Sequence, residues 1–191
     1  RDERLSRGLG DVYKRQQQRL LRVCKSDSNL HDVVLLALLT GARRGEICGL
    51  RWRDVDLKNR TVTFVQTKNG EIRKVPLSDQ AIALLRCRFS QRVKGMNDWV
   101  FPAEKSDGPV DVSHRFGRYA KKAGLEDFRF HDLRHSAASA MARAGVPERQ
   151  MQEVLGHKSV AMTKRYTHLR PSELDEAVAA MGTSIKNQGD V

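Results

Sequence analysis

One β-hairpin pattern lies between helical patterns, and it limits the fold more than any other feature of the chain. Residues 61–67, TVTFVQT, alternate apolar and polar side chains and are rich in β-branched residues, which is typical of half-buried strands. The turn-forming KNG at 68–70 follows, and EIRKVPLS at 71–78 predicts a returning strand that Pro76 closes. A short apolar piece, WVFP at 99–102, is a candidate third strand. The strands therefore predict one small antiparallel sheet.

Helical spacing fills most of the remaining sequence. It begins near Gln16, and Asp32 is the expected N-cap of the next helix, whose apolar run ends at TGARRGE. Later helices are expected from Ser78, over 111–124, up to Gly145, from Pro147 to Gly156, from Ser159 and over 172–181. We therefore expect a mostly helical α+β fold with a small antiparallel three-stranded β-sheet.

The length and the patterning together indicate one folded domain. A chain of 191 residues suffices for one domain with a substantial core, or for a large domain with tails. Residues 1–15 lack clear periodicity and are interpreted as a non-native or disordered leader. The folded domain is expected over 16–182, followed by a polar tail over 183–191.

The charge of the chain points to an anionic partner. The formal net charge is +12, from 35 basic and 23 acidic residues, and four of the last twenty residues are acidic against one basic. The rest of the chain is therefore more basic still, and it repels itself unless an anion binds it. Nucleic acid is the commonest such partner, an acidic membrane surface is a second choice, and solubility alone is the simplest interpretation.

Other simple features indicate a cytoplasmic protein. The longest apolar run, at 33–39, suits one buried helix rather than a membrane span, and the first residues lack the apolar stretch of a secretory signal. Cys24, Cys48 and Cys87 are far apart and form no CxxC pair, so they predict reduced thiols rather than disulfides or a zinc site.

Common cofactor and metal motifs do not occur in the sequence. It contains no GxxxxGK[ST], HExxH or GxSxG pattern. Asp54 and Asp56 are the candidate carboxylate pair for metal-assisted phosphate chemistry, but this spacing before a strand is more typical of a turn. We therefore expect no bound cofactor and no metal.

Several polar residues nevertheless form a set that suits metal-free cleavage of a phosphodiester. HDLRH places His131, Arg134 and His135 at i, i+3 and i+4, where they can share one helix face. The same set includes Arg43 after Gly41, Lys68 in the hairpin, His157 after a helix end and Tyr166 farther along. Arginines can grip the charged transition state, a Tyr can attack phosphorus in a cationic pocket, and Lys or His can protonate the leaving oxygen.

Four segments, in this order, resemble the successive motifs of the tyrosine recombinases of the phage-integrase type. They are TGARRGEICGLRWRDVD, TKNGEIRKVPL, HDLRH and LGHKSVAMTKRYTH, and the resemblance runs from about residue 28 to 170. It implies an integrase-type catalytic domain whose catalytic residues are Arg43, Lys68, His131, Arg134, His157 and Tyr166. Within this set Lys68 would be the general acid and Tyr166 the nucleophile, Glu46 would brace the site, and His135 is interpreted as structural.

The resemblance also implies the reaction and the partners. Members of the family attack a phosphate of double-stranded DNA, leave a 3′-phosphotyrosine, and exchange strands as a tetramer on paired sites without a cofactor. The expected setting is the bacterial nucleoid. The family's N-terminal DNA-binding domain is expected to be absent, because residues 1–15 leave little room for it. The helix at 172–181 is expected either to dock on a neighbouring protomer or to pack on its own domain.

Three other functions remain open from the residues alone. The helix–turn–helix pattern in AMARAGVPERQMQEVLGHKS also suits a DNA-binding regulator without catalysis. A metal-dependent nuclease would use Asp54 and Asp56, and a type IB topoisomerase would use the same tyrosyl step to relax supercoils. Each candidate residue also has a purely structural interpretation: helix capping for Arg43 and His157, a backbone contact for His131, solvation for Lys68, and packing in the core for Tyr166.

Overall fold

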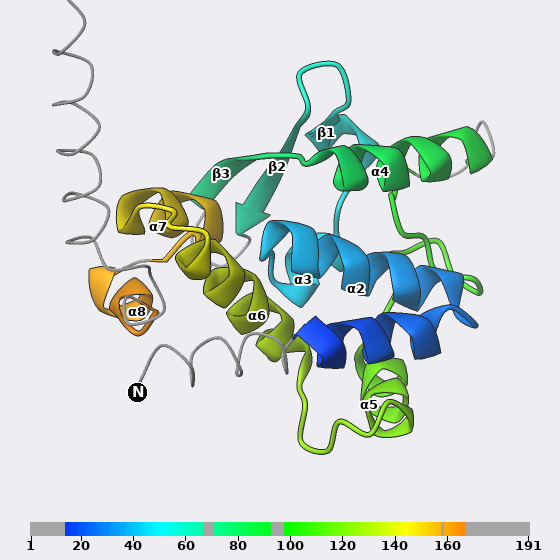
Figure 1. Ribbon diagram of the computed structural model, residues 1–191. Coiled ribbons are helices and arrows are strands. Elements are labelled where there is room, and N and C mark those ends of the chain that lie inside the picture. Colours follow the sequence, from blue (N-terminus) through cyan, green and yellow to red (C-terminus); the bar gives the residue numbers. More distant parts are fainter. Residues whose placement is uncertain (1–13, 67–70, 93–97, 158, 167–191) are drawn as a thin grey trace, which may run out of the picture.

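A computed structural model describes residues 14–66, 71–92, 98–157 and 159–166 (Figure 1). Residues 14–24 are helical. The elements that follow are α2 (Ser28–Thr40), α3 (Arg44–Cys48), the 3-10 helix η1 (Trp52–Asp54), β1 (Val55–Asp56), β2 (Thr61–Gln66), β3 (Glu71–Pro76), α4 (Asp79–Gln91), α5 (Ser113–Lys122), α6 (Phe130–Arg143), α7 (Glu148–Leu155) and α8 (Val160–Lys164). The predicted fold class, mostly helical with a three-stranded antiparallel sheet, is confirmed.

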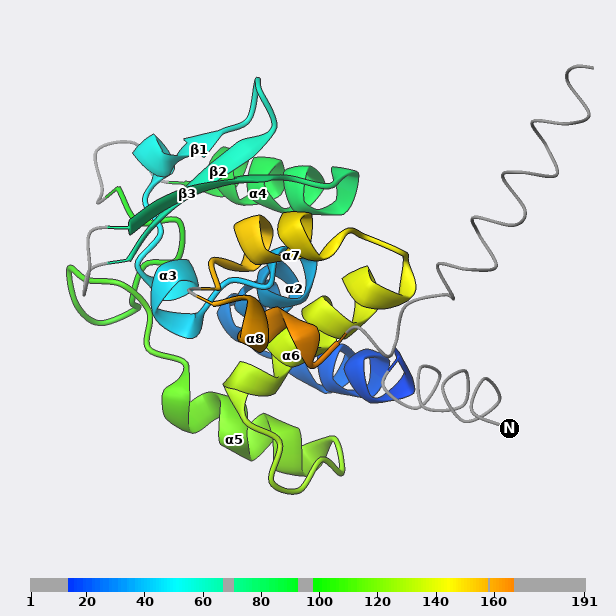
Figure 2. The same ribbon diagram turned by 90° about the vertical axis from the view of Figure 1, so that its left-hand side faces the viewer.

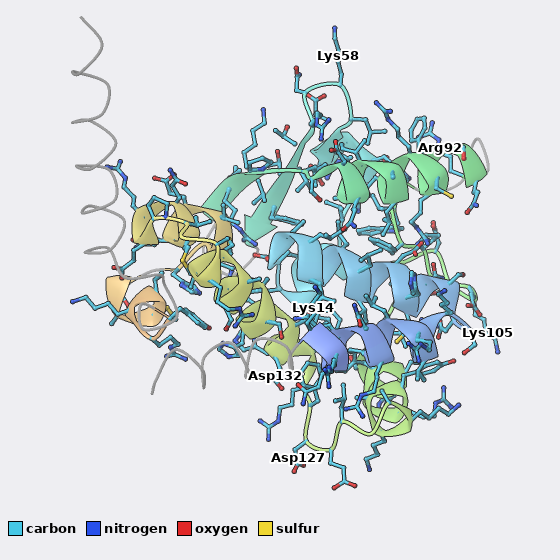
Figure 3. All side chains as sticks on the ribbon, in the orientation of Figure 1. Lys14, Lys58, Arg92, Lys105, Asp127 and Asp132 are labelled. Atoms are coloured by element: carbon cyan, nitrogen blue, oxygen red, sulfur yellow. The ribbon has the colours of Figure 1, made fainter. Side chains whose placement is uncertain are left out.

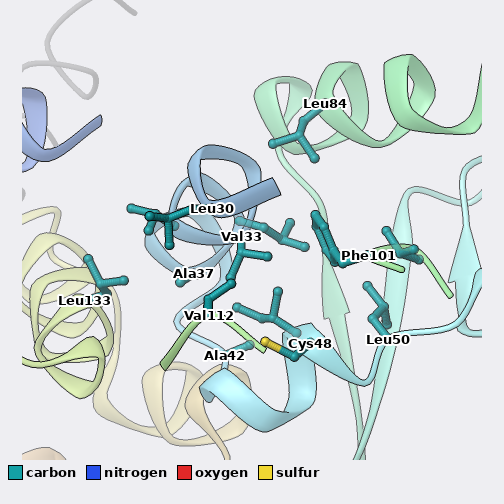
Figure 4. Packing of buried hydrophobic residues seen from close by; sticks show 14 of the residues in the cluster. Leu30, Val33, Ala37, Ala42, Cys48, Leu50, Leu84, Phe101, Val112 and Leu133 are labelled. Carbon is teal, nitrogen blue, oxygen red and sulfur yellow. The ribbon is translucent and has the colours of Figure 1, made fainter. Parts of the chain in front are cut away.

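Helix α2 lies at the centre of the core because its residues 33–39 are all apolar. It packs against α3, α4 and α6, and the views in Figures 1 and 2 show it enclosed by the other helices. In Figure 4, Leu30, Val33 and Ala37 of α2 lie between Leu133 of α6 on one side and Phe101 on the other. These five side chains are at most 1% exposed, and such burial is the main favourable contribution to folding.

The start of α2 differs from the prediction. Its N-cap is Asp27 rather than Asp32, and the Asp27 carboxylate accepts a hydrogen bond of 3.0 Å from the backbone N–H of Leu30. Asp32 lies inside the helix, where its carboxylate is 2.8 Å from the guanidinium of Arg88 on α4. The two carboxylates therefore fix the beginning of α2 and its contact with α4.

The hairpin predicted at 61–78 is present, although its turn lies outside the described residues. The strands follow the order β1-β2-β3, and β2 pairs antiparallel with β3, with Val62 opposite Val75 and Phe64 opposite Arg73. Val62, Phe64 and Val75 face the core, while Val65 is exposed. The alternation of side chains along β2 therefore corresponds to one buried and one exposed face of the strand.

The expected third strand at 99–102 is wrong. The third strand is β1, which pairs Val55 with Val62, whereas Trp99 and Pro102 form only isolated bridges to other segments. The backbone N–H of Val100 instead donates to the carbonyl of Leu50. The segment is apolar because Val100 and Phe101 are buried, not because it extends the sheet.

A second, smaller core lies between α6, α7 and the end of α8. Its buried members are Ala138, Ala142, Met151, Leu155 and Tyr166. Helix α7 also contacts β3, so this small core joins the helical part of the molecule to the sheet. Tyr166 is thus a core residue, as its structural interpretation supposed, but its hydroxyl is hydrogen-bonded to His135, outside this core.

Charged side chains cover the outside of the molecule. Figure 3 shows Lys58, Arg92 and Lys105 pointing away from it, at three separate places on its rim. Within the described ranges, every helix is too short or too polar to cross a lipid bilayer.

Gly41 follows the last residue of α2 and lies against α7, and two features of the structure require a glycine there. Its φ is +64°, in the left-handed region, and its backbone N–H donates to the Ala37 carbonyl at 2.8 Å. A Cβ atom built at Gly41 would lie 2.6 Å from Cδ2 of the buried Leu155. Only glycine allows this turn and this close approach of α7.

We expect Gly41→Ala to lower the free energy of unfolding by about 1–2 kcal/mol, because an L-residue is strained in the left-handed region. Gly117→Ala is the matched control, because Gly117 lies in α5 with nothing within 4 Å of a new Cβ. The control should raise stability by about 0.5–1 kcal/mol. Urea denaturation measures both changes, and a Gly41→Ala protein as stable as wild type would contradict this view of the junction.

Candidate active site

Arg43 lies between the turn at Gly41 and the first residue of α3. Its backbone N–H donates to Oε2 of Glu46 at 2.6 Å, and its Nη1 donates to Oε1 of the same carboxylate at 3.0 Å. Its Nη2 donates to the carbonyl of Gly156, at the end of α7, at 3.2 Å. The guanidinium therefore connects two segments that are far apart in the sequence, rather than capping α2.

Glu46 holds the site together through a second arginine. Arg73 on β3 donates from Nη2 to Oε2 of Glu46 at 2.7 Å and from Nε to the Val154 carbonyl at 3.0 Å. Burial alone would raise the pKa of Glu46, but the hydrogen bonds from Arg73 and from the Arg43 backbone outweigh it and hold the pKa below its usual value of 4.5. The carboxylate is thus ionised and shared between two cations.

Arg134 is the most deeply buried cation of the site. It is 4% exposed, and its Nη1 donates to the Gly41 carbonyl at 2.9 Å. Burial, followed by the charges of Arg43 and Arg73, lowers its pKa to about 10, so it remains charged at neutral pH. Its Nη2 is buried without a hydrogen-bond partner, which leaves a charged donor ready for a ligand.

A cavity of about 390 Å³ lies against this arginine. It is lined by Ala42, Arg43, Arg44, Gly45, Arg129, Phe130, His131 and Arg134. Four guanidinium groups and an imidazole around one hollow repel one another unless an anion neutralises them. The cationic lining of the cavity therefore suits the binding of an anion.

A second hollow of about 620 Å³ adjoins the first one at Arg43 and Gly45. Arg51, Arg53 and Trp99 are among its lining residues, and the Arg51 guanidinium lies 3.9 Å from the centre of the Trp99 ring. Glu46 and Asp54 also line this hollow, so its three arginines and two carboxylates extend the charged lining from the anion site toward strand β2.

His157 follows directly on the left-handed Gly156 that ends α7. Gly156 has φ +64°, and a Cβ there would lie 3.1 Å from Cδ of Arg73. Nδ1 of His157 is hydrogen-bonded to the hydroxyl of Thr163 on α8 at 2.8 Å. Burial, then Arg134 and Arg43, lowers the pKa of His157 to about 4, so the imidazole is neutral at pH 7.

Tyr166 lies just after α8 with its ring in the small core and its hydroxyl on α6. The side chain is 7% exposed, and the hydroxyl is hydrogen-bonded to Nδ1 of His135. Burial raises the pKa of Tyr166 above its usual value of 10, although Arg165 and Arg134 act in the opposite direction. The phenol is therefore protonated at neutral pH.

The structure brings together five of the six residues selected from the sequence. Arg43 reaches the residue before His157, Arg134 reaches the turn before Arg43, and the rings of His131 and His135 are 4.7 Å apart. His135 in turn contacts Tyr166. The sixth residue, Lys68, lies outside the described residues.

Three contact residues were not predicted as part of the site. Arg73 and Thr163 lie inside two of the four motif segments, but the sequence does not show that they contact Glu46 and His157. His135 was interpreted as structural, yet its i+4 spacing from His131 already placed it on the same helix face.

The residues of the rival functions have other roles in the structure. The Asp56 carboxylate accepts hydrogen bonds from the backbone N–H groups of Lys58 and Asn59 and thus closes a turn. In the part of the chain that is described, no three His, Cys, Asp or Glu side chains gather as a metal would require. Helix α7, the supposed recognition helix of a regulator, packs against α6, α8 and β3, with Met151 and Leu155 buried.

Comparison with known proteins gives one consistent result. Residues 11–173 match the phage integrase family. The integrase of Salmonella phage P22 is 36% identical over 192 residues, which cover 90% of this chain and 48% of that protein. The chain thus spans about half the length of the curated relatives that it matches.

Solved structures agree with the sequence match. A crystal structure of XerA recombinase has a TM-score of 0.71 and 30% identity over 87% of this chain and 61% of that one. The catalytic domain of bacteriophage HP1 integrase has a TM-score of 0.67 and 30% identity, over 86% of this chain and 90% of that one. The Tn1549 transposon integrase in complex with DNA shares the fold, with a TM-score of 0.70 at 23% identity, over 88% of this chain and 64% of that one.

The ion pairs of Glu46 predict a pH-dependent loss of stability. Glu46→Gln leaves two partly buried guanidinium groups without their carboxylate, and we expect a cost of about 3 kcal/mol at pH 7. Because the folded pKa of Glu46 is depressed, this contribution is present above the unfolded value near 4.5 and is lost as the pH falls through the folded value.

Urea denaturation at pH 7 and in the acid range measures this difference between wild type and variant. Glu153→Gln is the matched control, because Glu153 is 67% exposed and its partner Arg149 is 89% exposed. Such surface pairs contribute about 0–1 kcal/mol. A Glu46→Gln cost that stays constant as the pH falls would contradict the role of the ionised carboxylate.

Proposed function

The chain belongs to the phage integrase family of tyrosine recombinases, and from this we propose that it cuts and rejoins DNA strands at specific sites. During the reaction one DNA strand is joined covalently to Tyr166. The observation that supports this most strongly is the Tyr166 hydroxyl on α6, the helix whose Arg134 lines a cavity of cations and keeps a buried guanidinium nitrogen without a partner.

The two arginines stabilise the negative charge of the reacting phosphate. In the pentavalent transition state this charge lies on the equatorial oxygens, which guanidinium groups bind as planar, charged donors. Arg134 offers its free Nη2, and Arg43 lines the same cavity. An arginine in this position contributes roughly 10³–10⁵ to the rate of phosphoryl transfer.

His157 supplies a neutral donor to the same phosphate. When the Thr163 hydroxyl donates to Nδ1, the proton of the neutral imidazole lies on Nε2, which then donates to a phosphate oxygen. His131 lines the cavity as well and adds a second imidazole.

The bond changes are balanced in both directions. The phenolic oxygen of Tyr166 bonds to phosphorus and its proton passes to the histidine pair of α6, His131 and His135, which lies at the hydroxyl. The bond from phosphorus to the 5′ oxygen breaks, and Lys68 protonates that oxygen. Rejoining reverses the step when a 5′ hydroxyl attacks the phosphotyrosine. Because the phosphotyrosine retains the energy of the ester bond, rejoining needs no nucleotide. The role of Lys68 rests on the sequence motif.

Double-stranded DNA is the substrate that fits the charge distribution. The first hollow holds the scissile phosphate, and the adjoining hollow, lined by Arg51 and Arg53, holds phosphates that flank it. Contacts of this kind position DNA without reading its sequence. The net charge of +12 adds the long-range attraction that the backbone of DNA requires.

Exchange between two DNA sites requires four strand cleavages, so we propose that four protomers act together. The helix expected at 172–181, which lies outside the described residues, would dock on a neighbouring protomer in that assembly. The proposed place of action is the bacterial nucleoid in the cytoplasm. The regulator and the topoisomerase are not favoured, because the similar proteins are integrases and recombinases.

Tyr166→Phe removes only the phenolic oxygen and should abolish the covalent protein–DNA complex. The assay incubates the full chain with nicked duplexes that carry candidate sites and separates products on a denaturing gel. DNA affinity should stay within about threefold of wild type, because many Lys and Arg contacts carry binding. A variant that still forms the complex would contradict the assignment of the nucleophile.

Arg43→Ala and Arg134→Ala should each slow cleavage by roughly 10³-fold or more, because each removes a cation from the charged transition state. Single-turnover cleavage of the same nicked duplexes measures this rate, and a filter-binding titration measures DNA affinity. Arg149→Ala, on the exposed face of α7, is the control and should cleave at the wild-type rate. Normal cleavage by either site variant would remove that arginine from the mechanism.

A further inference from the structure

Two oppositely charged side chains of the larger hollow line it without pairing with each other. Arg51 and Asp54 flank the short helix η1, and the backbone N–H of Asp54 donates to the Arg51 carbonyl at 3.0 Å. Such a turn brings the side chains of residues i and i+3 to the same side. Both residues line the hollow of about 620 Å³, yet among the described residues neither side chain has a hydrogen bond or an ion pair. One donor group and one acceptor group therefore remain for a ligand between them.

The ring of Trp99 holds the Arg51 side chain in place. The carbon of the guanidinium lies 3.9 Å from the centre of the indole ring, and the backbones of the two residues form an antiparallel bridge. Next to this bridge, the backbone N–H of Val100 donates to the Leu50 carbonyl at 2.9 Å. Stacking on an aromatic ring covers one face of a guanidinium and leaves its N–H groups able to donate in the plane.

The carboxylate of Asp54 has no structural task of the kind that its neighbour has. Asp56 closes a turn by accepting two backbone hydrogen bonds, whereas Asp54 has no such partner within the described ranges. A phosphate in the hollow would satisfy the arginines but would be repelled by Asp54. The ligand of this hollow therefore includes hydrogen-bond donors as well as acceptors.

The other walls of the hollow suit a flat ring. Leu50, Phe64 and Val65 supply apolar surface, and Val65 is 46% exposed. A nucleobase has two apolar faces and an edge with donors and acceptors, and unstacked bases bind to aromatic, apolar and guanidinium groups in this way. Arg53 also lines the hollow and is exposed, so it remains for the phosphate of the same nucleotide.

We propose that the larger hollow binds an unpaired guanine base beside the scissile phosphate. This inference rests on the proposed function, in which strands that exchange partners must unpair next to the cut. The hollow meets the anion cavity at Arg43 and Gly45, and a Cβ built at Gly45 meets no atom within 4 Å. A nucleotide next to the scissile phosphate therefore reaches the hollow without an obstruction at this residue.

Guanine is the base whose edges match both side chains. Its O6 and N7 accept two hydrogen bonds from the planar fork of Arg51, which is the commonest specific contact of arginine with DNA. Its N1–H and N2–H are neighbouring donors, and both can donate to the carboxylate of Asp54. Adenine, cytosine and thymine each lack this pair of donors. The pocket should therefore select guanine over the other three bases.

The first test is an NMR titration of the labelled full chain with the four deoxynucleoside monophosphates. The guanine nucleotide, dGMP, should bind most tightly and should shift the indole N–H signal of Trp99. Asp54→Asn and Arg51→Lys should each weaken dGMP binding by roughly 10–100-fold, because each removes one bidentate contact. Arg51→Lys keeps the positive charge, so lost selectivity in this variant reports the fork rather than the charge.

Asp107→Asn is the matched control, because Asp107 is exposed and is not among the residues that line the hollow. It should bind dGMP like wild type. Equal affinity of wild type for the four nucleotides, or no shift of Trp99 at millimolar dGMP, would overturn the proposal. Unchanged selectivity in Asp54→Asn would overturn it as well.

The second test asks whether the guanine belongs to DNA. Gapped duplexes present one unpaired guanine next to the nick, and in matched duplexes hypoxanthine replaces it, which lacks the N2 amino group. Wild type should bind the hypoxanthine duplex at least about fivefold more weakly in filter binding, because a hydrogen bond to a carboxylate is lost. Asp54→Asn should bind both duplexes alike.

Other outcomes of these duplex measurements separate the possible sources and the two proposals. If dGMP binds but an unpaired guanine in the duplex gives no gain over hypoxanthine, the hollow takes free nucleotides and the proposal is wrong. If wild type forms no covalent complex with nicked DNA, the proposed function fails, whatever the nucleotide titration shows. If the complex forms and wild type does not discriminate among the bases, only the guanine site fails.

Discussion

The carboxylate of Glu46, enclosed by the guanidinium groups of Arg43 and Arg73, is the interaction on which the rest of the site depends. It ties α3 to the hairpin, and the same two arginines reach the carbonyls of Gly156 and Val154 on α7. One carboxylate thus offsets one of the two positive charges and aligns three elements. Without it, the repulsion between Arg43 and Arg73 would be uncompensated.

This arrangement leaves one charge without a partner. Arg134 is a buried residue of α6, and its Nη1 donates to the Gly41 carbonyl. Its Nη2 has no hydrogen-bond partner. Buried polar groups without a partner are uncommon in proteins, and a ligand that binds there is one explanation. The proposed ligand is the reacting phosphate, so the desolvation that costs stability in the free protein strengthens binding of the transition state.

Elements whose apolar residues recur at a fixed period could be predicted from the sequence. Contacts between elements that are distant in the sequence could not. The alternation of β2 predicted a strand, but β1 is two residues long and offers no period to detect. The true cap of α2, Asp27, lies five residues before Asp32 and was not sought there. Arg43, His131, Arg134, His157 and Tyr166 were found through motifs. Arg73 and Thr163 lie inside the same motif segments, but their roles are visible only in their contacts with Glu46 and His157.

The central claim is that the oxygen of Tyr166 attacks the phosphate held by Arg43 and Arg134. The chain has three tyrosines, at 13, 119 and 166, so the attachment point can be read directly. Proteolysis of the trapped protein–DNA complex, followed by mass spectrometry of the nucleotide-linked peptide, identifies the modified residue. The account predicts a 3′-phosphate on Tyr166, and a DNA strand attached to Tyr13 or Tyr119 would contradict it.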